Sequence, residues 1–342
     1  MERFLKSRYR IGQKISENPY SVTYKGSYLS SDKPVIIKIY KRAALTSSLI
    51  KIIRKKVKSF SLINHHNIAK IIDGDYGWQG YYYVREYIEG QSLTQILNQS
   101  KTMSIPEATK IILSVCDALS VAHKNGVIHG AISPNNILIS SQKIVKLTDF
   151  VVEGQIKEAL PQKAAFVSLG ANYISPEEAN GETAGPSSDI YSAALVMYEM
   201  LAGRLPYNVT GKNVALKILL SKIQDAPPPL STFSPEIPPI YGEILAKGLA
   251  RDPMLRFTTI DDFAESLKNK NVVSNLPIHD VPNISFDIAD RKNRSEERAR
   301  IRVPEKQKRG FSYQFGNWLV KLLILAILCG MVLAIILTLT RP

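Results

Sequence analysis

Three polar side chains are of types that enzymes use at reactive centres: the ammonium group of Lys38, the amide of Asn136 and the carboxylate of Asp149. Asn136 belongs to residues 129–138, which read His-Gly-Ala-Ile-Ser-Pro-Asn-Asn-Ile-Leu. The third of these is Ala131, and a methyl group can neither accept a proton nor orient a hydroxyl group. No carboxylate lies in this stretch, so it offers no base for proton transfer. Asn136 and Asp149 are also residue types that cap turns through local hydrogen bonds.

Several short motifs occur in the order in which protein kinases have them. Residues 129–138 resemble the catalytic loop, H-R-D-L-x-x-x-N, and residues 35–38 resemble V-A-I-K. Residues 147–151 stand where D-F-G is expected, and residues 175–177 resemble A-P-E. Over about residues 9–268 the chain therefore resembles the protein kinase superfamily, and more narrowly the bacterial membrane-anchored Ser/Thr kinases. The resemblance implies an α+β fold with two lobes, a small β-sheet lobe and a larger helical lobe.

Positions that the resemblance makes catalytic are occupied by other residue types. Ala131 stands where the family has its catalytic aspartate, and Lys56 where it has the glutamate that pairs with the strand lysine. Val151 replaces the glycine of D-F-G. The glycines of the loop that covers the phosphates fall on Ser16, Asn18 and Ser21. Glycine lets backbone N–H groups approach phosphates closely, so we expect an ordinary hairpin here instead of a phosphate cradle.

The resemblance also locates the adenine site. Ile36 corresponds to the small alanine that packs on the base, and Arg85 corresponds to the gatekeeper before the hinge. Both side chains add bulk, so we expect a partly filled pocket, no cofactor and no metal site. A reshaped pocket that binds ATP and Mg²⁺ weakly stays open as an alternative. In that case Lys38, Asn136 and Asp149 would hold the nucleotide and the metal, as their counterparts do in the family.

Other retained positions have structural roles in the family. Its regulatory apolar column corresponds to Phe60, Ile71, His129 and Phe150. Glu177 and Arg256 fall where the family makes a buried ion pair, and losing one member of such a pair costs about 3–5 kcal/mol. Asp189 corresponds to a hydrogen-bonding carboxylate that we expect to be structural.

Hydrophobic periodicity and turn signals indicate the elements that position these residues. We expect short strands at 9–15, 21–29 and 34–40, a helix at 43–62, and further strands at 68–72 and 81–87. Ser104 and Glu107 make a capping box that begins a long helix, and Asn125 with Gly126 ends it just before residues 129–138.

The same patterns divide the chain into four parts. These are an N-lobe at 1–88, a C-lobe at 89–270, a basic juxtamembrane linker at 271–317 and a transmembrane helix at 318–340. Residues 322–339 are uncharged and almost wholly apolar, and about twenty helical residues span the roughly 30 Å hydrocarbon core of a bilayer.

The flanks of this apolar run predict its orientation. Nine Lys or Arg and three Glu lie between residues 291 and 309, and only Arg341 follows the run. By the positive-inside rule, the kinase-like part is cytoplasmic and the chain is a single-pass protein with a C-terminal anchor. Ala326, Gly330 and Ala334 recur every four residues, which allows two such helices to pair in a homodimer, although this spacing also arises by chance.

The charge and the cysteine content of the chain limit the kinds of binding partner that it can have. The 342 residues carry a formal net charge of +14 and two cysteines in unrelated contexts, so no disulfide framework or metal cluster is implied. Residues 33–70 contain ten Lys or Arg and no acid. Such a run indicates first a solvated face, and second a docking face for anionic lipid or an acidic partner. We expect no nucleic acid partner, because no recognition motif accompanies the charge.

Together these features predict a catalytically inactive pseudokinase that is not an enzyme. It would be tethered to the membrane and act as a scaffold or regulatory binding module for protein partners in a membrane complex. The alternative is an atypical active Ser/Thr protein kinase that uses Lys38, Asn136 and Asp149. Ala131 is the residue on which the two hypotheses divide.

Overall fold

The computed structural model describes residues 3–42, 45–77, 80–150, 152, 155, 171–207, 209 and 213–270. The chain divides into two units, residues 1–277 and 278–342, and all described residues belong to the first. The strands are β1 (Arg3–Leu5), β2 (Tyr9–Glu17), β3 (Ser21–Tyr28), β4 (Pro34–Lys41), β5 (Ile71–Gly77), β6 (Gly80–Glu86), β7 (Gly90–Ser92), β8 (Ile137–Ser140) and β9 (Val145–Leu147). The helices are α1 (Ser47–Phe60), α2 (Leu93–Ser100), α3 (Ile105–Lys124), α6 (Pro176–Ala179), α7 (Pro186–Ala202), α8 (Val214–Gln224), α9 (Pro239–Gly248) and α10 (Ile260–Asn269).

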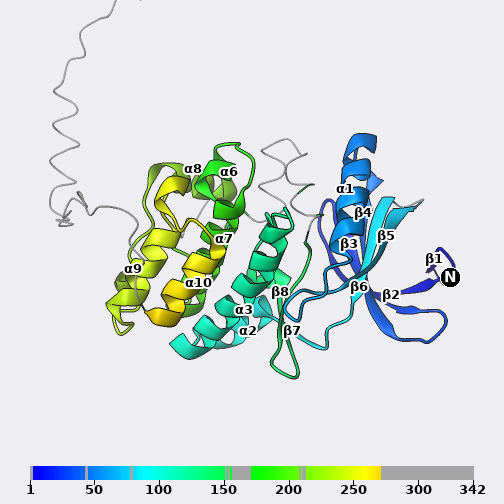
Figure 1. Cartoon of the computed structure of the whole chain (residues 1–342), viewed down its shortest axis with the longest axis horizontal. Helices are drawn as coiled ribbons and strands as arrows, with labels where there is room; N and C mark the ends of the chain where they lie inside the picture. The colour runs from blue at the N-terminus through cyan, green and yellow to red at the C-terminus, as the bar shows by residue number, and fades with distance from the viewer. Residues whose placement is uncertain are drawn as a thin grey trace, which may run out of the picture. The chain divides into compact units, whose positions relative to one another are not determined.

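The first part of the unit is an antiparallel sheet with strand order β1-β2-β3-β4-β6-β5, and α1 packs against β5 (Figure 1). Side chains alternate between the two faces of each strand. Val35, Ile37 and Ile39 of β4 join a small outer core together with Tyr82 and Val84 of β6. The opposite face of β4 and β6 looks toward the rest of the unit and contributes to the main core.

The register of β4 and β6 determines which polar side chains share that inner face. Lys38 lies directly opposite Tyr83, and Ile36 lies directly opposite Arg85. Residues opposite each other in an antiparallel pair point to the same face. A cation, a phenol and a guanidinium group are therefore presented together by two neighbouring strands.

Two predicted elements begin later in the chain than expected. The helix expected at 43–62 is α1, which begins after Thr46 because the Thr46 side chain accepts a hydrogen bond from the backbone N–H of Leu49. The strand expected at 68–72 is β5, which begins only at Ile71. Residues 67–69 are hydrogen-bonded to Leu147 of β9 instead, and this pairing with a distant segment is not visible in the local pattern.

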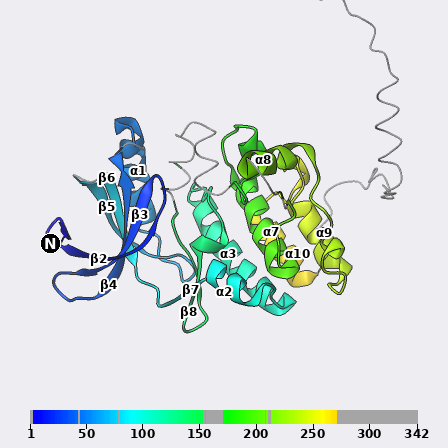
Figure 2. The ribbon, with the colours of Figure 1, turned by 180° about the vertical axis from the view of Figure 1, so that it is seen from behind.

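The second part of the unit is built around α7, most of whose residues are buried. Helices α3, α9 and α10 pack against it, as Figures 1 and 2 both show. The predicted long helix is confirmed as α3, with Ser104 and Glu107 forming the expected capping box. A small sheet of β7, β8 and β9 follows the first part of the unit, and β8 begins at Ile137, within residues 129–138. The two-lobed arrangement implied by the sequence is thus confirmed.

Among the described residues, no helix is both long enough and apolar enough to cross a bilayer. The predicted linker at 271–317, the predicted span at 318–340 and its small residues Ala326, Gly330 and Ala334 lie outside the described part of the chain. Val151 also lies outside it.

Candidate functional site

Lys38 and Asp149 form a buried ion pair between the inner face of the large sheet and the turn after β9. The Nζ atom of Lys38 lies 2.8 Å from Oδ2 of Asp149, and the two side chains are 7% and 11% exposed. In the structure Lys38 therefore points to Asp149. Lys56, at the position of the family's pairing glutamate, is exposed on α1 and has the same charge as Lys38. Lys38 therefore takes its anionic partner from the turn after β9.

Asp149 has a second set of partners on β6. Its Oδ1 atom accepts a hydrogen bond from the Tyr83 hydroxyl and lies 4.0 Å from Nε of Arg85. The backbone of Asp149 has a φ of 64°, in the left-handed region that side chains rarely adopt. Two cations and one carboxylate thus meet at this point, and these three groups together carry a charge of +1.

Asn136 ties residues 129–138 to the segment that leads to Asp149. Its side-chain amide donates to the carbonyl oxygen of Ala131 at 2.8 Å, and its own carbonyl accepts from the N–H of Thr148 at 2.8 Å. Ala131 is partly exposed. The loop is therefore held in a defined conformation with a methyl group at the position of the family's catalytic aspartate.

Aromatic stacking joins this loop to α1. The ring of Phe150 lies 4.5 Å from the ring of His129 and 4.7 Å from that of Phe60, measured between centroids. The His129 Nε2 atom lies 2.9 Å from the carbonyl oxygen of Thr148. Three of the four residues expected in the apolar column are thus in contact, and the fourth, Ile71, is buried in the same core.

Asp189 fixes the backbone at the start of the loop. One of its carboxylate oxygens accepts from the N–H of His129 at 2.9 Å, and the other accepts from the N–H of Gly130 at 2.8 Å. Nε2 of His123 lies 2.8 Å from the same carboxylate. Asp189 is fully buried, and these hydrogen bonds join its side chain to α3 and to the loop.

Glu177 and Arg256 form a two-point ion pair deep in the helical part. The guanidinium group donates to the two carboxylate oxygens at 2.8 and 2.6 Å, and the Ser188 hydroxyl donates to one of them at 2.7 Å. Burial alone would raise the pKa of Glu177, but the hydrogen bonds from Arg256 and Ser188 outweigh it and hold this pKa below its ordinary value. The carboxylate is therefore stabilised as an anion inside the protein.

The segment with Ser16, Asn18 and Ser21 is a hairpin turn between β2 and β3. The Asn18 side chain accepts from the N–H groups of Tyr20 and Ser21 at 2.9 and 2.7 Å. These are the amides that a phosphate-binding loop would have to present to its ligand, and Asn18 already occupies them. The observed turn agrees with the hairpin expected from the sequence.

Arg85 and Ile36 lie side by side, as their opposed positions in β6 and β4 require. Ile36 is buried, and the Arg85 guanidinium group donates to the carbonyl oxygen of Glu86 at 3.2 Å while approaching Asp149. The guanidinium group thus belongs to the charge cluster around Asp149.

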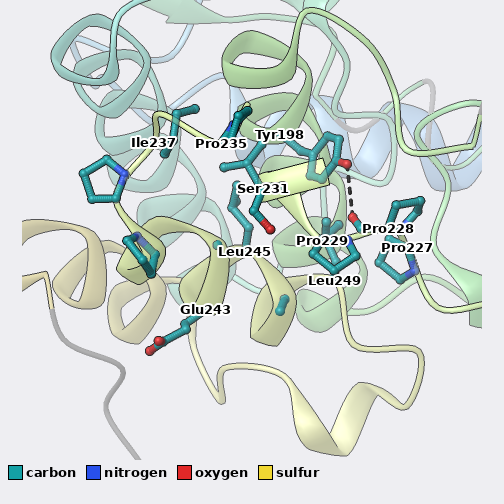
Figure 3. A pocket seen from close by; sticks show the side chains of 15 residues that line it. Tyr198, Pro227, Pro228, Pro229, Ser231, Pro235, Ile237, Glu243, Leu245 and Leu249 are labelled. Carbon is teal, nitrogen blue, oxygen red and sulfur yellow. Dashed lines mark hydrogen bonds between the residues drawn. The ribbon is translucent and has the colours of Figure 1, made fainter. Parts of the chain in front are cut away.

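A separate pocket of about 410 Å³ lies between α7 and α9 (Figure 3). Six prolines line it, and the Tyr198 hydroxyl at its wall donates to the carbonyl oxygen of Pro228 at 3.0 Å. Glu243 is the one Asp, Glu, Lys or Arg in the lining, and no Lys or Arg lines the pocket. This pocket is unsuited to a phosphate group, so the candidate site for phosphate chemistry remains the cluster around Asp149.

The residues at that cluster fit a nucleotide and Mg²⁺ chemically. Mg²⁺ takes oxygen ligands and is usually bound by one or two carboxylates together with substrate phosphates. Asp149 supplies a carboxylate and Asn136 an amide, and Lys38 supplies a cation for phosphate oxygens. Within the described residues no group of three His, Cys, Asp or Glu side chains could hold a metal ion unaided. A metal at this place would therefore depend on phosphate oxygens as well.

Comparison with known proteins supplies the family. Residues 9–272 match the family described as protein kinase domain. The chain is 31% identical to the probable serine/threonine-protein kinase PknB of Lactococcus lactis over 259 residues and 31% identical to the serine/threonine-protein kinase PrkC of Bacillus subtilis over 265 residues. These matches cover 75% and 77% of this chain. It is also 29% identical over 269 residues to the serine/threonine-protein kinase PknA of Mycobacterium tuberculosis, which covers 77% of this chain and 61% of that relative.

The chain spans 40% of the length of the first two of these relatives. The resemblance to bacterial Ser/Thr kinases that the motifs indicated is confirmed.

Three predictions from the sequence are contradicted by these matches. The chain was expected to be a pseudokinase that serves as a scaffold, to be no enzyme, and to take no cofactor. The matched domain is that of an enzyme family which uses ATP and Mg²⁺, and the similar proteins are named as kinases. The error came from reading the departures at Ala131, at Lys56 and in the glycine loop as a loss of activity, although phosphoryl transfer depends mainly on positioning and charge.

Sequence reasoning missed two members of the site. Tyr83 donates to Asp149, and the Tyr40 ring lies 5.6 Å from Nζ of Lys38. Both could have been found from strand alternation, because Tyr83 lies two residues before Arg85 and Tyr40 two residues after Lys38.

Proposed function

Because the chain belongs to the protein kinase family, we propose that it is an active Ser/Thr protein kinase with an atypical catalytic loop. The observation that carries this proposal is the buried pair of Lys38 and Asp149 at 2.8 Å, with Arg85 beside it. The two cations beside the carboxylate suit an anionic ligand such as a nucleoside triphosphate.

Lys38, Asn136 and Asp149 each have a role in this proposal. Lys38 would bind phosphate oxygens, while Asp149 and Asn136 would provide oxygen ligands for Mg²⁺. The metal, when bound, neutralises charge that develops on the phosphates. Tyr83 and Arg85 hold the Asp149 carboxylate in place from β6.

The methyl side chain of Ala131 determines how fast we expect phosphate transfer to be. The substrate hydroxyl forms a bond to the γ-phosphorus as the bond to ADP breaks, and its proton leaves to water because Ala131 cannot accept it. A positioned base contributes typically about 10²–10⁴-fold to such a step. Since the transition state is loose, positioning and charge supply most of the remaining acceleration. The proposed kinase is therefore slow.

The proposal places this kinase domain on the cytoplasmic side of a membrane. It rests on the apolar residues 318–340 and on the basic residues that precede them. Lipids, protein partners and a second copy paired through Ala326, Gly330 and Ala334 are the partners that this location supports.

The test is transfer of labelled γ-phosphate from ATP with Mg²⁺ to a generic Ser/Thr substrate by the full chain in lipid nanodiscs. Lys38→Met should remove at least about 90% of the incorporation, because it deletes the phosphate-binding cation. Lys33→Met is the matched control, since Lys33 is exposed at the start of the same strand region and should leave the rate unchanged. Equal incorporation by wild type and Lys38→Met would reject the proposal.

A further inference from the structure

One side of α1 presents a row of lysines to solvent. The buried face of this helix consists of Leu49, Ile53, Val57 and Phe60. Lys51, Lys55 and Lys58 follow one another at spacings of four and three residues, so they form one stripe opposite the buried face. All three are exposed. The helix is thus amphipathic, with a purely cationic outer stripe.

Among the described residues, these lysines form no ion pair with an acidic side chain. Within the described part of the chain, the ammonium groups of Lys51, Lys55, Lys56 and Lys58 form no hydrogen bond or ion pair. Arg54 of the same helix differs, since it lies 3.1 Å from Asp75. Like charges spaced three or four residues apart destabilise a helix by a few tenths of a kcal/mol per pair. An anionic surface placed against the stripe would relieve this repulsion.

Exposed aliphatic side chains accompany the stripe. Ile52 is 46% exposed on the flank of the helix, and Leu62 is 84% exposed two residues beyond its end. A basic helix with apolar residues beside its cations is typical of surfaces that lie on anionic membranes. An acidic protein would match the lysines alone, whereas a bilayer also gives the two aliphatic side chains an apolar environment.

We propose that the outer stripe of α1, formed by Lys51, Lys55 and Lys58 with Ile52 and Leu62 at its margin, is a docking surface for an anionic lipid bilayer. This inference is independent of the proposed kinase activity. The opposite face of the same helix carries Phe60, which stacks on Phe150 next to Asp149, so docking leaves the internal contacts of the site intact.

The test measures the acylation rate of individual lysines by mass spectrometry on the full chain in nanodiscs. Discs of phosphatidylcholine alone are compared with discs that contain about 30% phosphatidylglycerol. We expect acylation of Lys51, Lys55 and Lys58 to slow at least about fivefold in the anionic discs and to recover in about 0.5 M salt, which screens surface charge. Lys110, Lys143 and Lys268 are exposed elsewhere and serve as internal controls with unchanged rates.

A charge-reversal variant tests the same surface from the protein side. Each basic residue near an anionic surface contributes about a fivefold factor, so the triple change Lys51→Glu, Lys55→Glu and Lys58→Glu should weaken docking at least about a hundredfold. Acylation of the remaining Lys56 should then be equally fast in both kinds of disc. The triple change of Lys110, Lys143 and Lys268 to Glu alters net charge equally and should leave docking intact.

Three results would overturn the proposal. The first is equal acylation of the α1 lysines in neutral and anionic discs. The second is slowing that affects the control lysines to the same degree. The third is protection by added polyglutamate but not by anionic lipid, which would assign the stripe to an acidic polypeptide instead. None of these measurements depends on phosphate transfer, so they separate this inference from the proposed function.

Discussion

Two buried charge networks in this protein differ in the groups that they bring together. In the helical part, Glu177 and Arg256 balance each other at two points, and Ser188 adds a further donor. At the inner face of the sheet, Lys38 and Arg85 both lie against the carboxylate of Asp149. The first network is electrically closed, as a scaffold requires. The second gathers two cations around a carboxylate, groups that suit a phosphate ligand and a metal, and it lies beside a loop that lacks its base.

The largest expected effect comes from restoring that base. Ala131→Asp places a carboxylate at the family's catalytic position and should raise phosphate transfer by about 10²–10⁴-fold. The measurement is the initial rate of phosphate incorporation, with Ala131→Asn as the control of similar shape that cannot act as a base. If both variants resemble the wild type, the cleft lacks more than its base and the contrast between the two networks is wrong.

The closed network should be the more costly one to break for stability. Arg256→Leu leaves the Glu177 carboxylate buried without its partner, and we expect a loss of about 3–5 kcal/mol in the free energy of unfolding. The double variant Glu177→Leu with Arg256→Leu removes both charges and should lose less than the single one. Denaturant unfolding of the full chain measures both values. A double variant less stable than either single one would contradict this account.

This ion pair also predicts a dependence on pH. The pKa of Glu177 is held below its ordinary value, 4.5, so the pair contributes its full stability above that pH. Stability is lost as pH falls through the lowered pKa, where the folded carboxylate takes up a proton. The difference in unfolding free energy between wild type and Glu177→Gln should therefore be constant from about pH 7 to pH 5 and shrink at lower pH. A difference that grows on acidification would show that the pKa is raised instead.

A smaller loss is expected at the loop backbone. Asp189→Asn replaces one of the two carboxylate oxygens that accept from His129 and Gly130 with an amide donor, so one buried N–H loses its acceptor. We expect a loss of about 1–3 kcal/mol in stability. Thermal unfolding measures it, and an unchanged midpoint would mean that water replaces the missing acceptor.

Local sequence signals predicted the parts of this fold that local interactions decide. The capping box of Ser104 and Glu107 predicted the start of α3, and the residues around Asn18 predicted a hairpin. The start of β5 was missed because residues 67–69 pair with β9, some 80 positions away in the chain. The partner of Lys38 could not be predicted from local signals for the same reason, because the ion pair with Asp149 joins β4 to a turn beyond β9.

The function was predicted wrongly for a different reason. The absence of a carboxylate at position 131 limits the rate of phosphate transfer. It was interpreted as evidence that phosphate transfer does not occur at all. Of the residues singled out as a possible nucleotide and metal site, the structure brings Lys38 and Asp149 into contact.

The most direct test of the central claim is phosphate transfer by the wild-type full chain compared with Asp149→Asn, each purified in the same way and supplied with ATP and Mg²⁺. The wild type should incorporate phosphate slowly but measurably, and Asp149→Asn should fall to background because the metal-binding carboxylate is lost. Incorporation that is absent from the wild type, or that survives unchanged in Asp149→Asn, would contradict the claim that this cluster is a working kinase site.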